Sequence, residues 1–533
     1  MRRQRTGAAV AGAAAIAGIA AVALGAGIGE LGAGLVAAQS GPFTVIGGWI
    51  IDLAPSWAKD LMIALFGTGD KAALLGAIGL VVALAAAGAG VWESRRRRAG
   101  AVTALALGLL IGALALTRPD AGALAWAPSA VAGAVAALAL GPLVRLAVPA
   151  GAASPTSAAV AAGDPDGAPG SGSASTPSRR SFILFAGSAA AVGALAAVGG
   201  TLLRAGTAAA TAVREAIRLP RPAVPAPPIP AGAELAIDGL APLVTPNGDF
   251  YRIDTALTVP DVDPADWELR IHGMVEQEVR LTWDELLALP LVESAATLSC
   301  VSNEVGGDLV GNALWLGYPI RELLARARPL PRADMALSRS VDGFTAGTPL
   351  EALTDDRGAL LAVGMNGEPL PRQHGFPVRM VVPGLYGYVS ATKWVVDIEV
   401  TRFDRARAYW TDRGWSARGP IKLQSRIDVP RAGAAVPPGD AVIAGVAWQP
   451  GTGVAAVEVR IDDLPWQRAE LAPAISQDTW VQWRLPWRAA PGPHRIACRA
   501  ISATREVQTG RRAFPAPDGA TGWHAIEVTV ADA

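Results

Sequence analysis

One cysteine carries the strongest chemical signal in this chain. Cys300 is one of two cysteines in 533 residues and lies within the run TLSCVSNEVGG, residues 297–307. An apolar lead-in followed by an asparagine and paired glycines predicts a strand that ends in an exposed loop. Such a loop is a suitable place to hold a reactive sulfur.

The second cysteine offers a structural alternative. A disulfide between Cys300 and Cys498 would suit an exported protein, and the sequence alone leaves that pairing open. Cys498 lies in a separate strand-rich region, where a buried free thiol is the ordinary state of a cysteine. We therefore expect Cys498 to be buried and unpaired.

Basic residues recur downstream of Cys300 in short motifs. These are NGEPLPRQHGFPVR at residues 366–379, VPGLYG at 382–387 and KW at 393–394. Taken singly, a histidine before glycine is usually a turn residue, and an arginine in an apolar strand is usually paired or extended to solvent. Taken together and in this order, the motifs resemble the molybdopterin-dependent oxidoreductases of the sulfite oxidase family, over roughly residues 235–533.

This resemblance implies one molybdenum–molybdopterin cofactor per chain, with Cys300 as the thiolate ligand of the metal. It implies catalytic roles for Cys300, for Arg252, which lines the active site, and for Trp415, which stands nearest to the family's active-site tyrosine. The residues matched to cofactor binding are Arg252, Cys300, Asn303, His374, Arg379 and Lys393. Asn303 and the following glycines would permit close backbone approach to the metal.

Two departures from the family pattern bear on the substrate. Animal and plant sulfite oxidases carry arginines after the ligand cysteine, whereas this chain reads Asn303-Glu304-Val305, and Trp415 lacks a tyrosine hydroxyl. A dianionic substrate would meet less positive field here, which puts sulfite in doubt. The resemblance thus predicts two-electron oxygen-atom transfer on a small substrate, whether sulfur-containing or not. An S-oxide-type reductase on the same fold and a cofactor-free membrane-anchored binding module are the alternatives.

Composition limits the partners of such an enzyme. With 46 basic and 46 acidic residues the net charge is zero, which points away from nucleic acid. Two cysteines without a Cys-x-x-Cys-His motif predict neither attached haem nor an iron–sulfur cluster. We therefore expect electrons to pass to or from a separate carrier, either a redox protein or a quinone.

The elements before residue 205 are those of a membrane protein. Hydrophobic residues make up 51% of the chain, and five segments are apolar and long enough to span a bilayer: 8–28, 72–92, 99–117, 123–144 and 182–203. Arginines near the N-terminus, at 95–98 and at 179–180 would be cytoplasmic by the positive-inside rule. A multi-pass protein of the cell membrane with an extracytoplasmic catalytic half follows. Residues 39–70 suggest a helix in the membrane interface or a short extracytoplasmic contact.

The resulting fold class is multi-domain: an all-α membrane region, an α+β catalytic domain and an all-β immunoglobulin-like sandwich. The expected order is 1–148 four-helix membrane region, 149–180 flexible cytoplasmic linker, 181–204 fifth membrane helix with a twin-arginine-like signal, 205–232 proline-rich spacer, 233–417 molybdopterin-binding catalytic domain and 418–533 immunoglobulin-like domain. Helices are expected from a capping box at Thr282 and over residues 314–324. By resemblance, the C-terminal domain leaves a homodimer open.

Overall fold

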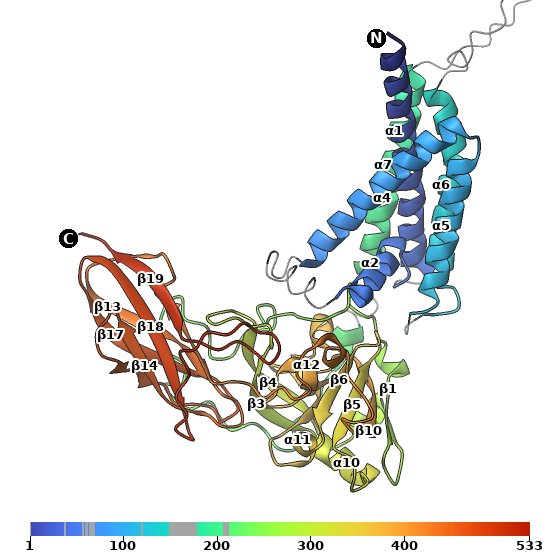
Figure 1. Cartoon of the computed structure of the whole chain (residues 1–533). Coiled ribbons are helices and arrows are strands. Elements are labelled where there is room, and N and C mark those ends of the chain that lie inside the picture. Colours follow the sequence, from blue (N-terminus) through green and yellow to red (C-terminus); the bar gives the residue numbers. More distant parts are fainter. Residues whose placement is uncertain are drawn as a thin grey trace, which may run out of the picture. The chain divides into compact units, whose positions relative to one another are not determined.

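The computed structural model describes residues 2–36, 39–55, 58, 62, 65, 70–118, 121–148, 179–205 and 213–532. The chain forms two compact units. The helical unit consists of Met1–Ala209 with Ala256–Thr258, and the β-rich unit consists of Ala210–Thr255 with Val259–Ala533. Figure 1 shows helices in the first unit and sheets with short helices in the second. The expected linker over residues 149–178 lies outside the described residues.

The helical unit is a bundle around its first helix. Its helices are α1 (Arg2–Val36), α2 (Pro42–Leu53), α4 (Asp70–Arg95), α5 (Ala99–Ala115), α6 (Ala127–Ala147) and α7 (Arg179–Ala205). Helix α1 packs against α4, α6 and α7, and α5 packs against α6 (Figure 1). Of the helix expected within 39–70, the structure describes α2, and most of residues 56–69 lie outside the described residues.

Four of the five predicted spans are long and apolar enough to cross a membrane. They are Ala8–Val36, Ala72–Arg95, Ala127–Ala147 and Arg180–Leu203. The predicted span 99–117 forms helix α5, whose 17 residues fall just short of the other four. These helices indicate association with a membrane.

Glycines allow the helices of this bundle to pack at short backbone distances. A Cβ on Gly193 of α7 would overlap the backbone of Ala23 in α1, and a Cβ on Gly27 of α1 would overlap the backbone of Gly193. Small residues allow this approach because apolar side chains gain little by leaving lipid, so close backbone packing becomes the main source of helix association.

Two sheets build the first part of the β-rich unit. One has the order β2-β1-β10-β5-β6, and the other has the order β3-β4-β7-β8 with β9 also on β7. The strands are β1 (Glu268–Gly273), β2 (Val279–Thr282), β3 (Val292–Ser299), β4 (Val310–Pro319), β5 (Met335–Ser340), β6 (Thr345–Pro349), β7 (Leu360–Met365), β8 (Glu368–Pro369), β9 (Arg379–Val381) and β10 (Val395–Thr401).

Short helices connect these strands. They are η3 (Pro264–Asp266), α9 (Trp283–Leu287), α10 (Ile320–Ala327), α11 (Glu351–Thr354), η4 (Arg372–His374), α12 (Gly387–Ser390) and η5 (Thr411–Arg413). The capping box expected at Thr282 is confirmed, with Glu285 as its reciprocal partner at the start of α9. The helix expected over 314–324 begins only at Ile320, because β4 continues to Pro319 and is buried along almost its whole length.

Two further sheets form the C-terminal part. Their orders are β11-β13-β17-β16 and β12-β19-β18-β14-β15. The strands are β11 (Gln424–Val429), β12 (Ala435–Val436), β13 (Gly439–Trp448), β14 (Val454–Ile461), β15 (Gln467–Arg468), β16 (Glu470–Leu471), β17 (Val481–Ala489), β18 (Gly492–Ser502) and β19 (His524–Val530). A common core lies between them and includes Trp483, Ile496 and Cys498. Assignment of this two-sheet part to the immunoglobulin class stays a prediction.

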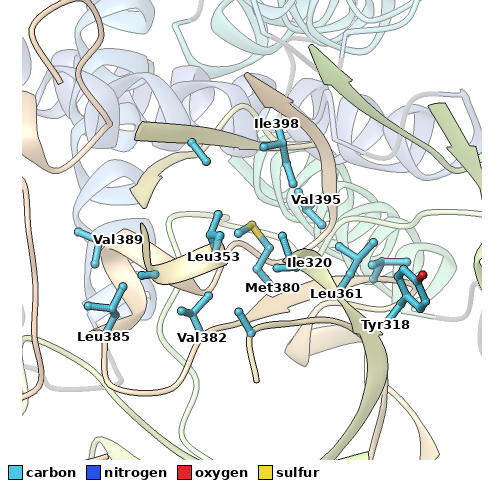
Figure 2. Close-up of a cluster of buried hydrophobic side chains, with 14 of the residues drawn as sticks. Tyr318, Ile320, Leu353, Leu361, Met380, Val382, Leu385, Val389, Val395 and Ile398 are labelled. Atoms are coloured by element: carbon cyan, nitrogen blue, oxygen red, sulfur yellow. The ribbon is translucent and has the colours of Figure 1, made fainter. Parts of the chain in front are cut away.

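The largest core of the β-rich unit lies where β4, β7, β9, α12 and β10 meet. Figure 2 shows part of it, with Met380 among Leu353, Ile320 and Leu361. The same core continues into the C-terminal part through Trp448 and Trp480. The two parts therefore share buried apolar surface rather than only a linker.

Part of the expected proline-rich spacer is bound to this unit. Val224 forms a parallel bridge with Val292 at the start of β3, Ala223 N–H donates to the Leu291 carbonyl at 2.7 Å, and Glu293 N–H donates to the Val224 carbonyl at 2.9 Å. Prolines are compatible with such an edge position, where few backbone N–H groups are needed. The segment thus covers the outer edge of β3 at its first residues.

The glycine contacts between α1 and α7 predict a measurable asymmetry. Gly193→Ala should lower the free energy of unfolding of the full chain in detergent by about 1–3 kcal/mol, because the new methyl group would overlap the backbone of α1. Gly187→Ala on the same helix should leave stability unchanged or raise it, because nothing lies within 4 Å of its Cβ position. Thermal unfolding of both variants measures this. Equal effects of the two variants would contradict close packing at Gly193.

Candidate active site

Strand β3 places Cys300 beside an apolar core. Alternate residues of a strand share a face, so Cys300 continues the face of Ala296 and Leu298, which pack with Phe250 and Trp315. Cys300 follows the last residue of the strand and is 9% exposed. The strand is as predicted, but the loop is not exposed at the cysteine. Both Cys300 and Cys498 are free and buried, which confirms the expectation for Cys498.

Asn303 shapes the loop that follows the cysteine. Cys300 N–H donates to the Leu309 carbonyl at 2.9 Å, and Asn303 N–H donates to the Cys300 carbonyl at 3.1 Å. The Asn303 side-chain oxygen accepts from Leu309 N–H at 2.9 Å. These bonds close residues 300–309 into a compact turn. The asparagine thus orders the loop through its side-chain oxygen, and its expected contact with the cofactor stays a prediction.

The surroundings of the Cys300 thiol act on its pKa in opposite directions. Burial raises its pKa, while donation from the backbone and hydroxyl of Ser302 and the charge of Lys393 act in the opposite direction. A buried thiol with donors and a cation at hand is well prepared to bind a metal as a thiolate, since metal binding displaces the proton.

A buried arginine lies on the same side of the sheet. Met380 of β9 and the flanking residues Val378 and Val382 belong to the large core, part of which Figure 2 shows. Val381 belongs to the core beside Cys300, and Arg379 shares its face of the strand. Arg379 is 5% exposed, and burial lowers its pKa to about 10. Among the described residues it donates to the carbonyls of His374 at 3.1 Å and Met380 at 3.3 Å. Its guanidinium lies 5.1 Å from the centre of the Trp315 ring.

Two more cations share one carboxylate. Lys393 Nζ lies 2.6 Å from Asp254 Oδ2 and 3.1 Å from the Gln373 carbonyl, and Arg252 Nε lies 3.0 Å from the same carboxylate oxygen. Burial lowers the pKa of Lys393 to about 8, with Asp254 opposing that shift. Gly375, at φ 112°, lets the backbone pass between Arg379 and Lys393, because a Cβ there would lie 2.9 Å from one side chain and 3.2 Å from the other.

His374 is a neutral member of the group. Its Nε2 lies 3.1 Å from the Asn247 carbonyl, and because a carbonyl only accepts, Nε2 carries the proton. Burial, helped by the charge of Arg379, lowers the pKa of His374 to about 4. The ring also meets Phe250 edge to face at 5.6 Å.

Two tyrosines near the cysteine were not among the predicted site residues. Burial raises the pKa of Tyr251, with Cys300 adding to the shift and Arg379 opposing it, so its hydroxyl stays protonated at neutral pH. Burial raises the pKa of Tyr386 to about 12, and Cys300 again adds. Tyr386 lies inside the motif VPGLYG and Tyr251 directly precedes Arg252, and this adjacency to predicted residues was the only available signal.

The structure thus brings Cys300, Arg252, His374, Arg379 and Lys393 into one electrostatic group, while Trp415 contacts other rings. Its ring lies 5.9 Å from that of Tyr388 and 6.1 Å from that of Trp410. Trp415 is 6% exposed within the large core. A direct role at the reacting atoms stays a prediction for this residue.

The donor set fits an anionic cofactor held by one soft metal ligand. Arg252, Arg379 and Lys393 supply three cations. Asp254 is the carboxylate that pairs with Lys393 and Arg252, whereas the hydrogen bonds of Arg379 go to the carbonyls of His374 and Met380. Burying charge is costly unless it is compensated, so the excess positive charge favours a bound anion such as a phosphate.

Comparison with known proteins agrees with this chemistry. Residues 256–410 match the family described as "Oxidoreductase molybdopterin binding domain". The chain is therefore a molybdopterin oxidoreductase. The sulfite oxidase of Gallus gallus is 30% identical over 316 residues, which cover 50% of this chain and 68% of that protein. On this relationship the chain belongs to the sulfite oxidase family.

Two other relatives show how much of each chain is shared. The mitochondrial sulfite oxidase of Macaca fascicularis is 32% identical over 315 residues, covering 50% of this chain and 57% of that protein. The uncharacterized oxidoreductase YuiH of Bacillus subtilis (strain 168) is 31% identical over 180 residues, covering 33% of this chain and 87% of that protein. The chain thus spans less than two thirds of the macaque relative.

The low pKa of His374 predicts loss of stability in acid. The unfolded chain binds a proton near the usual pKa of 6.5 and the folded chain only near 4, so stability should fall as pH drops through this interval, by at most about 3 kcal/mol. Urea unfolding of the full chain, followed by tryptophan fluorescence at pH 7 and pH 4.5, measures this.

His374→Gln, whose amide can still donate to Asn247, should reduce that acid sensitivity. His494→Asn is the matched control, because pairing with Asp462 raises the pKa of His494 and its stabilising effect is present in acid. An unchanged pH dependence in His374→Gln would contradict a neutral buried His374.

Proposed function

We propose that this chain is a membrane-anchored, extracytoplasmic oxidoreductase that catalyses two-electron oxygen-atom transfer on a small substrate. The observation that carries the proposal is the placing of the Cys300 thiol in one electrostatic group with Arg379, Lys393 and Arg252. A single soft ligand beside excess positive charge suits a molybdenum–molybdopterin cofactor better than a bare cation.

We assign the residues separate parts in binding this cofactor. Cys300 would be the thiolate ligand of the metal, and Arg379 and Lys393 would neutralise the anionic groups of the pterin. His374 would donate or accept hydrogen bonds as a neutral ring. When bound, the molybdenum centre supplies the redox chemistry of oxygen-atom transfer.

Arg252 is the best candidate for contact with the substrate. Its side chain is 34% exposed, whereas those of Lys393 and its partner Asp254 are 10% and 5% exposed. Asp254 fixes the guanidinium through Nε, which leaves other N–H groups for an incoming oxygen atom. Tyr251 and Tyr386, protonated at neutral pH, add hydroxyl groups next to the cysteine.

We propose a substrate with less negative charge than a dianion. The exposed Glu304 follows the cysteine, and Asp254 neutralises one of the three cations. Both reduce the positive field along the approach. Small sulfur compounds are the first class to test, and electrons would be exchanged with a separate carrier.

The membrane topology is also a proposal. If α5 crosses the bilayer beside the four longer helices, five spans place the N-terminus and the arginines at 95–98 on the cytoplasmic side and the β-rich unit outside. A folded, cofactor-loaded unit would then be exported behind the pair Arg179-Arg180, in a context that resembles a twin-arginine signal.

Metal analysis tests the enzymatic proposal. The full chain, purified in detergent from a host that makes the cofactor, should contain about one molybdenum and one pterin. Cys300→Ser should lose the thiolate-to-metal absorption and turnover, whereas Cys498→Ser should keep both, because Cys498 lies in the C-terminal core. Turnover would be screened with sulfite plus ferricyanide and with an S-oxide plus a reduced dye. A folded chain free of molybdenum would favour a binding module.

Protease accessibility tests the topology. In intact spheroplasts an external protease should cleave the β-rich unit of the wild-type chain, and Arg179→Lys with Arg180→Lys should protect it. Arg95→Lys with Arg96→Lys is the matched control, since it changes two arginines that are not in the signal context. Unchanged cleavage of the first variant would remove the twin-arginine interpretation.

A further inference from the structure

The C-terminal part of the β-rich unit reaches the loop that carries Cys300. Arg426 of β11 donates from Nη1 to the Gly307 carbonyl at 2.9 Å. At the adjacent position, a Cβ on Gly306 would overlap the imidazole ring of His524, the first residue of β19. Two strands of different sheets thus meet the same two loop residues.

Arg426 is held rigidly at this contact. Its Nε lies 2.6 Å from Asp428 Oδ1 and its Nη2 lies 3.3 Å from Asp428 Oδ2, and the two side chains are only 12% and 9% exposed. Asp428 in turn accepts from Ala241 N–H at 3.1 Å. A paired guanidinium of this kind has little freedom, so its bond to the Gly307 carbonyl is directional.

His524 is oriented by its other ring nitrogen. Nδ1 accepts from Ile427 N–H at 2.9 Å, which places the opposite edge of the ring over Gly306. Gly306 has φ 82°, and only a glycine combines this conformation with space for the ring. The ring therefore limits how far the loop can move toward the C-terminal part.

The strand before the cysteine is fixed independently. Thr297 accepts at its hydroxyl from Trp480 N–H at 2.7 Å, and Thr297 N–H donates to the Asp478 carbonyl at 2.9 Å. The contacts of Arg426 and His524 lie on the other side of the sulfur, after it in the chain. They add to the bonds of Asn303 and Leu309 inside the loop and fix residues 306–307 against the C-terminal part.

We infer that Arg426 and His524 are positioning residues, which hold the loop so that the Cys300 sulfur keeps a fixed direction toward the cation group. The C-terminal part then has a function at the active site in addition to any role in assembly. The inference rests on the proposed function only in giving Cys300 the role of metal ligand.

The first test uses the cofactor-free full chain and reads the sulfur directly. Alkylation of Cys300 by iodoacetamide, followed by peptide mass spectrometry, should be about tenfold faster in Arg426→Lys, because the lysine can pair with Asp428 but loses the bond to Gly307. His524→Asn should also be faster, because its amide can accept from Ile427 while the ring atoms over Gly306 are gone.

The matched control is Arg499→Lys. Arg499 forms an ion pair with Glu458 at 2.6 Å elsewhere in the C-terminal part, with both side chains 23% exposed. This variant should alkylate Cys300 at the wild-type rate, and the buried Cys498 should stay slow in every variant. Unchanged Cys300 rates in both Arg426→Lys and His524→Asn would overturn the inference.

The second test uses the loaded chain. The Mo(V) electron paramagnetic resonance spectrum depends on the direction of the metal–sulfur bond, so Arg426→Lys and His524→Asn should shift its g values while Arg499→Lys should not. If the protein takes up no molybdenum but the alkylation rates change as expected, the positioning inference stands and the proposed function falls. If molybdenum is bound and neither measurement changes, the positioning inference falls alone.

Discussion

Positive charge buried beside a thiol is the constraint on which the β-rich unit depends. Arg379 and Lys393 are almost fully buried, and the single carboxylate of Asp254 forms ion pairs with both Lys393 and Arg252. Desolvating such groups is costly, which is visible in the lowered pKa values of Lys393 and Arg379. The free energy gained by burying apolar side chains in the cores must offset this desolvation penalty. A bound anionic ligand would also reduce it.

The strands meet this constraint through their two-residue period. In β9 one set of alternate residues packs into the large core while Arg379 points to the opposite side, beside the face of β3 that ends at Cys300. A one-residue shift of register would bury a different set and remove the cation from the thiol. Asn312 and Asn366 tie down the segment before Tyr251 by bonds to the Leu243 and Thr245 carbonyls at 2.8 Å and 2.9 Å.

The sequence could predict most of the residues that surround the Cys300 thiol, but not the contacts among them. Cys300, His374, Arg379 and Lys393 stand in recognisable motifs, so their proximity could be expected from resemblance. The contacts of Asp254 and Tyr251 could not be predicted this way, because they join segments far apart in the chain. The exposure expected for Cys300 was wrong for the same reason, since contacts from distant segments, such as those of Arg426 and His524 with the loop at Gly307 and Gly306, cannot be seen in the sequence.

The segment at residues 223–226 has a consequence for any shortened form of this protein. It pairs with the first residues of β3 through the bridge between Val224 and Val292, and Arg214 before it donates to the Leu370 and Pro369 carbonyls at 2.9 Å and 2.7 Å. A fragment cut at residue 233, where composition places the domain boundary, would uncover the edge of β3 at its first residues, near Val292. Such an edge recruits strands from other molecules, so the fragment would aggregate for a reason unrelated to its catalytic residues. A soluble fragment that keeps residues from 213 onward avoids this, because the protein carries its own protective strand.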